Sequence, residues 1–223
     1  MDTGVYVSTM RRLKDYEMLA FACRRGGKIR DEGRSYYSIG VLYDNIQKYH
    51  KAVEYYEKFL QVCKSIGDSH GEALAYNCIG VDYQMLGEKD VTHIEKAVEY
   101  HNKHEQLADT NGKFLASINL GLCYDRLGDY KNSVYWYQSA LKHSVKMSNL
   151  VGQSLAIGNI GKIGAKGLNE NKDKMKVFVE KYLKLAKEMR DEKGEMNGCL
   201  KLGLISGSKK NFEEGRENFL RAL

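Results

Sequence analysis

A pair formed by a large aliphatic residue and a glycine recurs along the chain, and it constrains the fold more than any other sequence feature. Successive copies lie 40, 41, 40 and 42 residues apart, and a second apolar segment follows each copy. A fixed period of this length, with two apolar segments per unit, is typical of helical repeat proteins, whose units stack to bury a shared core. The pairs are Ile39-Gly40, Ile79-Gly80, Leu120-Gly121, Ile160-Gly161 and Leu202-Gly203.

The composition favours helix throughout the chain. The 223 residues include no proline, whereas ordinary proteins contain roughly 5%. Proline removes a backbone donor and clashes with the preceding turn, so its absence suits a chain that is helical almost everywhere. Apolar residues recur three and four positions apart instead of alternating, which indicates helices and not strands. We therefore predict an all-α protein.

The glycine of each pair needs a physical reason, because glycine inside a helix costs roughly 1 kcal/mol relative to alanine. A chain that accepts this cost in every unit is expected to need the space that a side chain would fill. We predict that the second helix of each unit approaches the first helix closely at this glycine.

We interpret residues 1–223 as a single solenoid. Residues 8–24 match a second helix, because Tyr16-Glu17 aligns with Tyr56-Glu57 and Gly27 aligns with Gly67. The opening half repeat and a shortened last repeat lead us to expect a piece of a longer chain or complex. The predicted divisions are 8–30 for the half repeat, then 31–70, 71–111, 112–151, 152–193 and a truncated fifth repeat at 194–223.

Charge and cysteine content narrow the class of protein. The formal net charge is +6, and the excess of lysine and arginine lies in the half from residue 113 onward. The five cysteines are odd in number, form no CxxC pair and lie in apolar helical patterns, which predicts free thiols in a reducing compartment. Neither a secretory signal nor the ~20 apolar residues of a membrane span occurs. We expect a cytoplasmic protein, with the cytoskeleton or a cilium as candidate locations.

The repeated unit resembles the tetratricopeptide repeat (TPR) across essentially the whole chain. The core Leu120-Gly121-x-x-Tyr124 and the pair Ala140-Leu141 match the TPR pattern, and the stretch Gly67 to Ala73 resembles a long-repeat subgroup. That subgroup includes the Leu-Gly-Asn-repeat adaptors and rapsyn. The resemblance implies a right-handed α–α superhelix, here of about eleven antiparallel helices. It also implies that the first helices line a concave groove for a peptide or helix of another protein.

One position departs from this subgroup. The Leu-Gly-Asn adaptors carry asparagine just after the repeat glycine, in a ladder that holds an extended peptide. The lysine and asparagine set with which chaperone-binding TPR proteins clamp a C-terminal carboxylate is not supplied either. The predicted ligand therefore differs from both, because apolar residues occupy four of the five ladder positions, which are Val41, Val81, Leu122, Lys162 and Leu204.

The residues of the predicted groove are the candidate binding site. They would present an apolar stripe that is flanked by carboxylates in the early repeats and by lysines in the fourth. Such a surface suits an amphipathic helix or extended segment whose charge runs from basic to acidic. In the alternative interpretation, Val41, Val81 and Leu122 are buried between neighbouring first helices. The candidate residues are Tyr37, Val41, Asp44, Asn77, Val81, Gln84, Ile118, Leu122, Asp125, Lys162, Lys166 and Leu204.

No motif predicts a catalytic residue, a cofactor or a metal. The stretch Gly158 to Lys162 resembles a phosphate-binding loop, but it has two residues between its glycines instead of four, and no strand precedes it. His101 and His104 lie three residues apart, yet no third ligand is in phase with them. We expect exposed polar side chains at these two histidines.

We predict a non-enzymatic scaffold or adaptor that binds a peptide or amphipathic helix of another protein. The alternative is a structural subunit of a large cytoskeletal or ciliary assembly. A third hypothesis is nucleic-acid binding through the basic C-terminal half. This third hypothesis is disfavoured because such charge is more often a solvated helix face.

Overall fold

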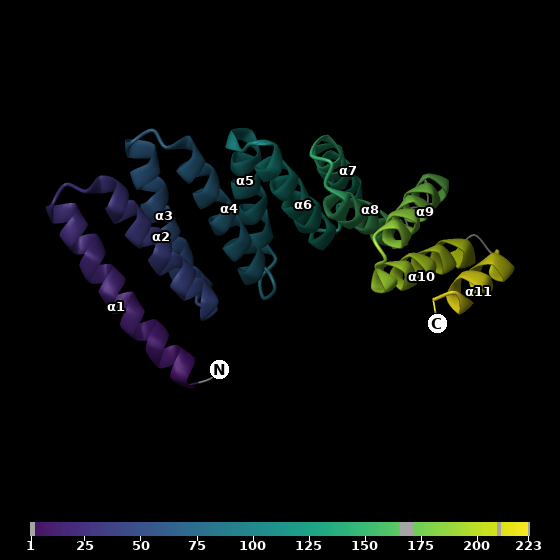
Figure 1. The fold of residues 1–223 in the computed structure, drawn as a ribbon, viewed down its shortest axis with the longest axis horizontal. Helices are drawn as coiled ribbons and strands as arrows, with labels where there is room; N and C mark the ends of the chain where they lie inside the picture. The colour runs from purple at the N-terminus through teal and green to yellow at the C-terminus, as the bar shows by residue number, and fades with distance from the viewer. Residues whose placement is uncertain (1–2, 166–171, 209–210, 223) are drawn as a thin grey trace. The chain divides into compact units, whose positions relative to one another are not determined.

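The computed structural model describes residues 3–165, 172–208 and 211–222, and all regular secondary structure in these ranges is helical (Figure 1). These ranges contain eleven helices. The prediction of an all-α chain of about this many helices is confirmed. The helices are α1 (Thr3–Arg25), α2 (Ile29–Asn45), α3 (Tyr49–Ser65), α4 (Ser69–Leu86), α5 (Thr92–Leu107), α6 (Thr110–Arg126), α7 (Tyr130–Lys146), α8 (Leu150–Ala165), α9 (Lys172–Glu188), α10 (Glu192–Ser208) and α11 (Phe212–Leu220).

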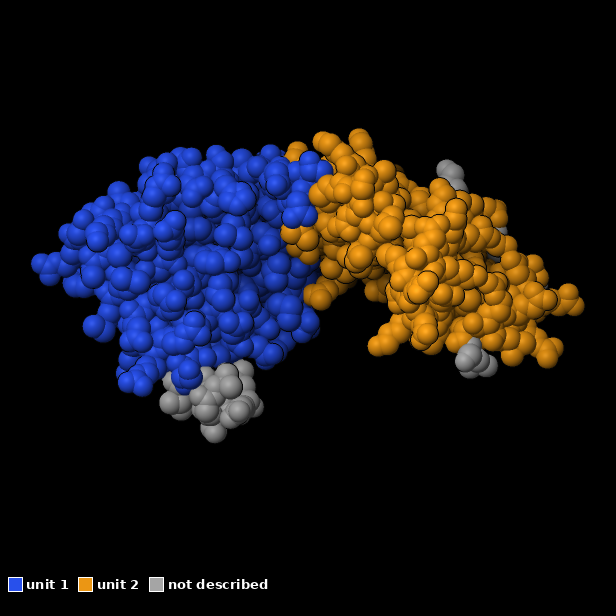
Figure 2. All heavy atoms as spheres, viewed as in Figure 1, with its two compact units in different colours: residues 1–112 blue, residues 113–223 orange. Residues whose placement is uncertain are grey.

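The chain divides into two compact units, residues 1–112 and 113–223 (Figure 2). In the first unit, α1 packs on α2, α2 on α3, α3 on α4 and α4 on α5. In the second unit, α7 to α11 pack in the same sequential way, and α8 also contacts α10. Helix α6 packs on α7, where the Ser133 hydroxyl donates to the Gly121 carbonyl at 2.9 Å. Each unit has its own buried core, and the expectation of one solenoid domain stays a prediction.

Each first helix of a hairpin begins two residues before the repeat boundary predicted from the sequence. At α4, α6, α8 and α10 a side chain caps the helix N-terminus, whereas α2 has no side-chain cap. The Asp68 carboxylate accepts the Gly71 N–H at 2.9 Å, and the Asp191 carboxylate accepts the Gly194 N–H at 3.0 Å. Such a cap contributes about 1 kcal/mol. The helices concerned begin at Ile29, Ser69, Thr110, Leu150 and Glu192.

The glycine of each repeated pair meets a side chain of the second helix, as the sequence predicts. A methyl group added at Gly40 would lie 2.6 Å from a ring carbon of Tyr56, and one added at Gly121 would lie 2.5 Å from a ring carbon of Tyr137. Side chains do not approach this closely, so only glycine permits the observed helix spacing. The remaining pairs are Gly80 with His101, Gly161 with Val179, and Gly203 with Phe219.

His101 and His104 of α5 are buried, which corrects the expectation of exposed polar side chains. His101 stands against Gly80 where the first repeat has Tyr56 against Gly40. Burial lowers the pKa of His101 to about 3, so this residue packs as a neutral ring. In the part of the chain that the structure describes, no group of three or more His, Cys, Asp or Glu side chains is arranged to hold a metal ion.

The length and composition of a helix determine whether it can cross a membrane. None of the helices in the described residues combines the length and the apolar character that crossing a lipid bilayer requires.

Gly121→Ala is expected to lower the free energy of unfolding by about 1–3 kcal/mol, because the added methyl group must displace the buried Tyr137 ring. Gly207→Ala in α10 is the matched control, since nothing lies within 4 Å of its added methyl group. The control is expected to gain up to about 1 kcal/mol from helix propensity. Urea denaturation measures both values. Equal effects of the two substitutions would contradict the close-packing explanation.

Candidate protein-binding faces on the first helices

The candidate residues lie on the first helices of the hairpins, which are α2 and α4 in the first unit. Tyr37, Val41 and Val81 are half-buried there. The Tyr37 ring lies 5.3 Å from the Phe59 ring of α3, and Val41 packs against the core of the unit. These side chains are therefore neither fully exposed in a groove nor fully buried between helices. Neither interpretation of the sequence describes them fully. Asp44 and Asn77 are half-buried as well.

In the second unit the candidate residues lie on α6, α8 and α10. Leu122 is half-buried against the core, whereas Leu204 is 53% exposed. The structure brings two candidates together, because the Lys162 ammonium lies 3.4 Å from the Asp125 carboxylate. This ion pair links α6 to α8. Lys166 lies outside the described residues.

Two candidate residues are not placed where the sequence suggested. Gln84 and Ile118 were expected to face a partner, but both side chains are buried. The helical period alone places them on the groove side, whereas packing against neighbouring helices covers them. They present little surface for contact with another protein.

The first unit has a hollow of about 230 Å³ between α2, the end of α3 and the start of α4. Tyr37 lines it together with the apolar side chains of Phe59, Val62 and Leu74. The guanidinium-bearing side chain of Arg30 also borders the hollow. One candidate residue from the sequence thus belongs to a concave surface with an apolar lining and a cationic border.

The second unit has a hollow of about 460 Å³ that involves α8, α9 and α10. Lys201 lies in it, donates to the Gly158 carbonyl at 2.9 Å and lies 5.0 Å from the centroid of the Tyr182 ring. Burial, followed by the charge of Lys162, lowers the pKa of Lys201. Sequence reasoning missed Lys201, although it lies on α10 three residues before the candidate residue Leu204.

Sequence reasoning also missed a buried carboxyl group in α4. Asp82 is 1% exposed, and it stands two residues after its repeat glycine, where other first helices carry Leu42 and Cys123. Burial raises the pKa of Asp82 to about 8, and the neighbouring Asp44 adds to this effect through its charge and a hydrogen bond. Asp82 is therefore a buried acid group that does not reach the surface of α4.

Asp82 makes the stability of the first unit depend on pH. The folded state keeps the Asp82 proton up to about pH 8, whereas the unfolded chain releases it near pH 4. Stability is therefore complete below about pH 4 and declines as the pH rises from 4 to 8. Asp82→Asn imitates the protonated carboxyl, so it should be nearly neutral at pH 4.5 and stabilising by about 2–4 kcal/mol at pH 8.5.

Thermal or urea unfolding at the two pH values measures this difference. Asp15→Asn, an exposed position on α1, is the control and should show no pH-dependent gain. A gain for Asp82→Asn that is the same at both pH values would show that Asp82 is not the titrating group.

Two segments of the chain match a known protein family. Residues 33–65 and 116–142 match the family described as tetratricopeptide repeat. These two segments are similar to the tetratricopeptide repeat. The first match covers most of the α2–α3 hairpin, and the second covers most of α6 and α7. TPR proteins generally mediate protein–protein interactions.

A curated relative supports the same assignment. The chain is 26% identical over 155 residues to Tetratricopeptide repeat protein 29 of Trypanosoma brucei brucei. The alignment covers 65% of this chain and 32% of the relative. The chain therefore spans about a third of the length of the curated relative that it matches.

Solved structures share the fold at low sequence identity. BtubC (BKLC) from P. vanneervenii has a TM-score of 0.76 at 15% identity, over 99% of this chain and 90% of that chain. The kinesin light chain TPR-like repeats of Podosopora anserina give 0.64 at 15% identity, over 85% and 92% of the two chains. The apo form of RapI gives 0.62 at 12% identity, over 95% and 96%. These similarities confirm the predicted TPR solenoid fold, while membership of the long-repeat subgroup stays a prediction.

Proposed function

We propose that this chain is a non-enzymatic scaffold that binds a segment of another protein on the face formed by its first helices. The observation that carries the proposal is a set of exposed aliphatic side chains on α8 and α10. Leu155 is 48% exposed and Leu204 is 53% exposed, and Val151 and Leu200 are also exposed. Apolar side chains gathered on a surface and bordered by polar groups mark interaction sites.

The charges beside these surfaces suggest the character of the partner. Lys162 and Lys201 accompany the apolar side chains in the second unit, whereas the half-buried Asp44 lies on α2 in the first. A partner segment would complement the second unit where it is acidic, and it would complement the first unit where it is basic beside Asp44. This is the charge order proposed from the sequence for an amphipathic helix or an extended peptide.

The cysteines bear on where such a scaffold would work. All five are free, and free thiols persist in a reducing compartment. We propose that the chain acts in the cytoplasm.

The double variant Leu155→Glu/Leu204→Glu tests the proposal. Each added carboxylate would have to lose water without gaining a partner, so affinity for a cross-linked and identified partner protein should fall at least tenfold. Val177→Glu is the matched control, because Val177 is exposed on the second helix α9. Isothermal titration calorimetry measures the affinities, and circular dichroism checks folding. Unchanged affinity in a folded double variant would reject the first-helix face as the binding surface.

A further inference from the structure

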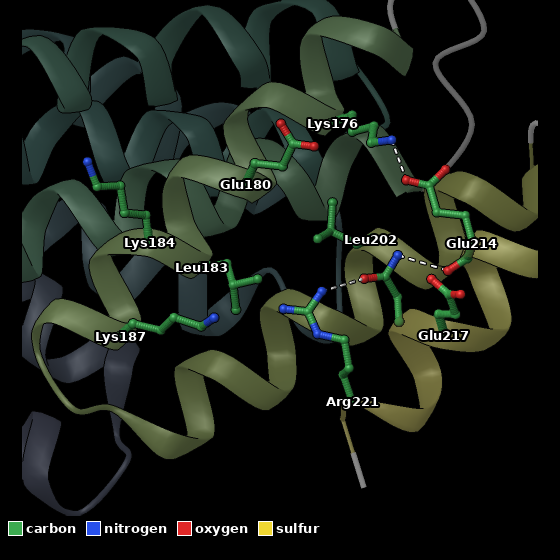
Figure 3. Close-up of a pocket in the computed structure, with 10 residues that line it drawn as sticks. Lys176, Glu180, Leu183, Lys184, Lys187, Leu202, Glu214, Glu217 and Arg221 are labelled. Carbon is green, nitrogen blue, oxygen red and sulfur yellow. Dashed lines mark hydrogen bonds and ion pairs between the residues drawn. The ribbon is translucent and has the colours of Figure 1, made fainter.

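A cavity of about 440 Å³ lies among α9, α10 and α11 on the side of the second helices (Figure 3). The buried side chains of Leu183 and Leu202 line it. Glu180 of α9 and Arg221, which directly follows α11, also border it. The cavity therefore has a small apolar part inside a charged and polar border. Besides Glu180 and Arg221, the border consists of Lys176, Lys184, Lys187, Glu214, Glu217 and Asn218.

Comparison of the hairpins shows which side chain lies at the corresponding position of the other second helices. In every hairpin, one side chain of the second helix meets the repeat glycine, and the residue just before it can be compared between hairpins. That residue is aromatic in four second helices, where it is Tyr55 in α3, Tyr100 in α5, Trp136 in α7 and Phe178 in α9. In α11 the same position holds Asn218, which precedes Phe219.

In the first unit, tyrosines at this position bridge successive second helices. The Tyr55 hydroxyl donates to the Glu17 carboxylate of α1 at 2.9 Å. The Tyr100 hydroxyl donates to Glu57 of α3 at 3.4 Å. Each bridge therefore consists of a ring on one second helix and a carboxylate acceptor on the preceding one.

A lysine covers each of these rings. Lys58 lies 4.2 Å from the centroid of the Tyr55 ring, and Lys103 lies 5.1 Å from that of Tyr100. Each lysine stands three residues after its tyrosine. The arrangement is a phenol held between a carboxylate and a cation.

Between α9 and α11 the carboxylate and the cation are present but the ring is missing. Glu180 follows Val179 just as Glu57 follows Tyr56, and Arg221 stands three residues after Asn218. The short Asn218 side chain donates to the Glu214 carbonyl of its own helix at 2.9 Å and does not bridge to α9. The cavity is thus located where a tyrosine of the chain itself would bind in the first unit.

The first helix of the last hairpin, α10, also lacks the aromatic side chains that surround the ring in the first repeat. In the first repeat, the rings of Tyr36 and Tyr43 of α2 lie 6.3 Å and 5.6 Å from the Tyr55 ring. Tyr36 and Tyr43 lie four residues before and three residues after the repeat glycine Gly40. At the same two offsets from Gly203, helix α10 carries the much smaller Cys199 and Ser206. The Ser206 hydroxyl is buried and has no hydrogen-bond partner.

We propose that the α9–α10–α11 cavity binds a tyrosine side chain of a partner protein. The ring packs on Leu183 and Leu202, the phenol hydroxyl donates to Glu180, and the Arg221 guanidinium covers the ring face. Glu180 is the part that selects tyrosine over phenylalanine, because only the phenol can donate a hydrogen bond to it. Apart from Leu202 of α10, this site is formed by residues of α9 and of the segment from α11 onward, so it differs from the set of exposed aliphatic side chains proposed for the scaffold function.

The test uses N-acetyl-tyrosinamide as the probe and the methyl resonances of Leu183 and Leu202 as the signal. Titration of the full chain should give saturable shifts of these resonances, with a Kd of about 1–10 mM for so small a ligand. N-acetyl-phenylalaninamide should bind at least threefold more weakly. Absence of saturable shifts, or equal affinity for the two probes, would overturn the proposal.

Two variants test whether the probe binds in the α9–α10–α11 cavity. Asn218→Tyr should fill the cavity from within, abolish probe binding and raise Tm, whereas Asn197→Tyr at an exposed position of α10 should leave binding unchanged. Probe binding that persists in folded Asn218→Tyr would place the probe elsewhere and overturn the proposal. Should Asn218→Tyr not fold, Glu180→Ala decides. It should reduce affinity for the tyrosine probe at least threefold without changing the phenylalanine probe, and an unchanged preference would count against the site.

Discussion

The contact between a glycine of the first helix and a side chain of the second helix is the constraint on which each hairpin depends. The tyrosine rings of Tyr56 and Tyr137 lie where any β-carbon on Gly40 or Gly121 would be. Helices that approach this closely exclude water and bury the ring almost completely. The same geometry accepts a neutral imidazole, a valine or a phenyl ring at the other repeats. The glycine is therefore required, while the side chain that fills its space can vary.

Much of the fold could be predicted from this spacing alone. The glycine pairs identify the hairpins, and the first helices begin only two residues from the predicted boundaries. An Asp or Asn cap precedes α4, α6, α8 and α10, whereas α2 has no side-chain cap. His101 was misjudged because the longer turn of the second repeat places it five residues farther from its glycine than Tyr56 is from Gly40. Its role as the ring that packs on Gly80 became visible only from the contact itself.

The candidate site was less predictable, because burial depends on neighbouring helices and not on one helical period. The period places Gln84 and Ile118 on the predicted stripe, but packing covers both. Asp82 could not be foreseen as a buried carboxyl, since its position is ordinarily apolar. The ion pair of Asp125 with Lys162 joins two residues that the sequence singled out separately. Spacing thus gave the helices on which a site could lie, and packing decided which side chains are accessible.

The two proposed surfaces follow from the same repeat. First helices leave aliphatic side chains exposed on α8 and α10, and second helices leave a cavity where the repeated aromatic residue is replaced by Asn218. The cavity is a departure from regular repetition, because in the first unit a tyrosine of the chain itself occupies the corresponding position. A repeat scaffold can acquire binding sites in this way without any change in the hairpin itself.

A double-mutant cycle between Gly121→Ala and Tyr137→Ala tests the central claim most directly. If the ring is what the glycine accommodates, Gly121→Ala should be destabilising in the wild-type chain but neutral or stabilising once the ring is removed. The predicted coupling free energy, measured by urea unfolding, is about 1–3 kcal/mol. Strict additivity of the two substitutions would contradict the account, because it would show that the glycine is needed for some reason other than contact with the second helix.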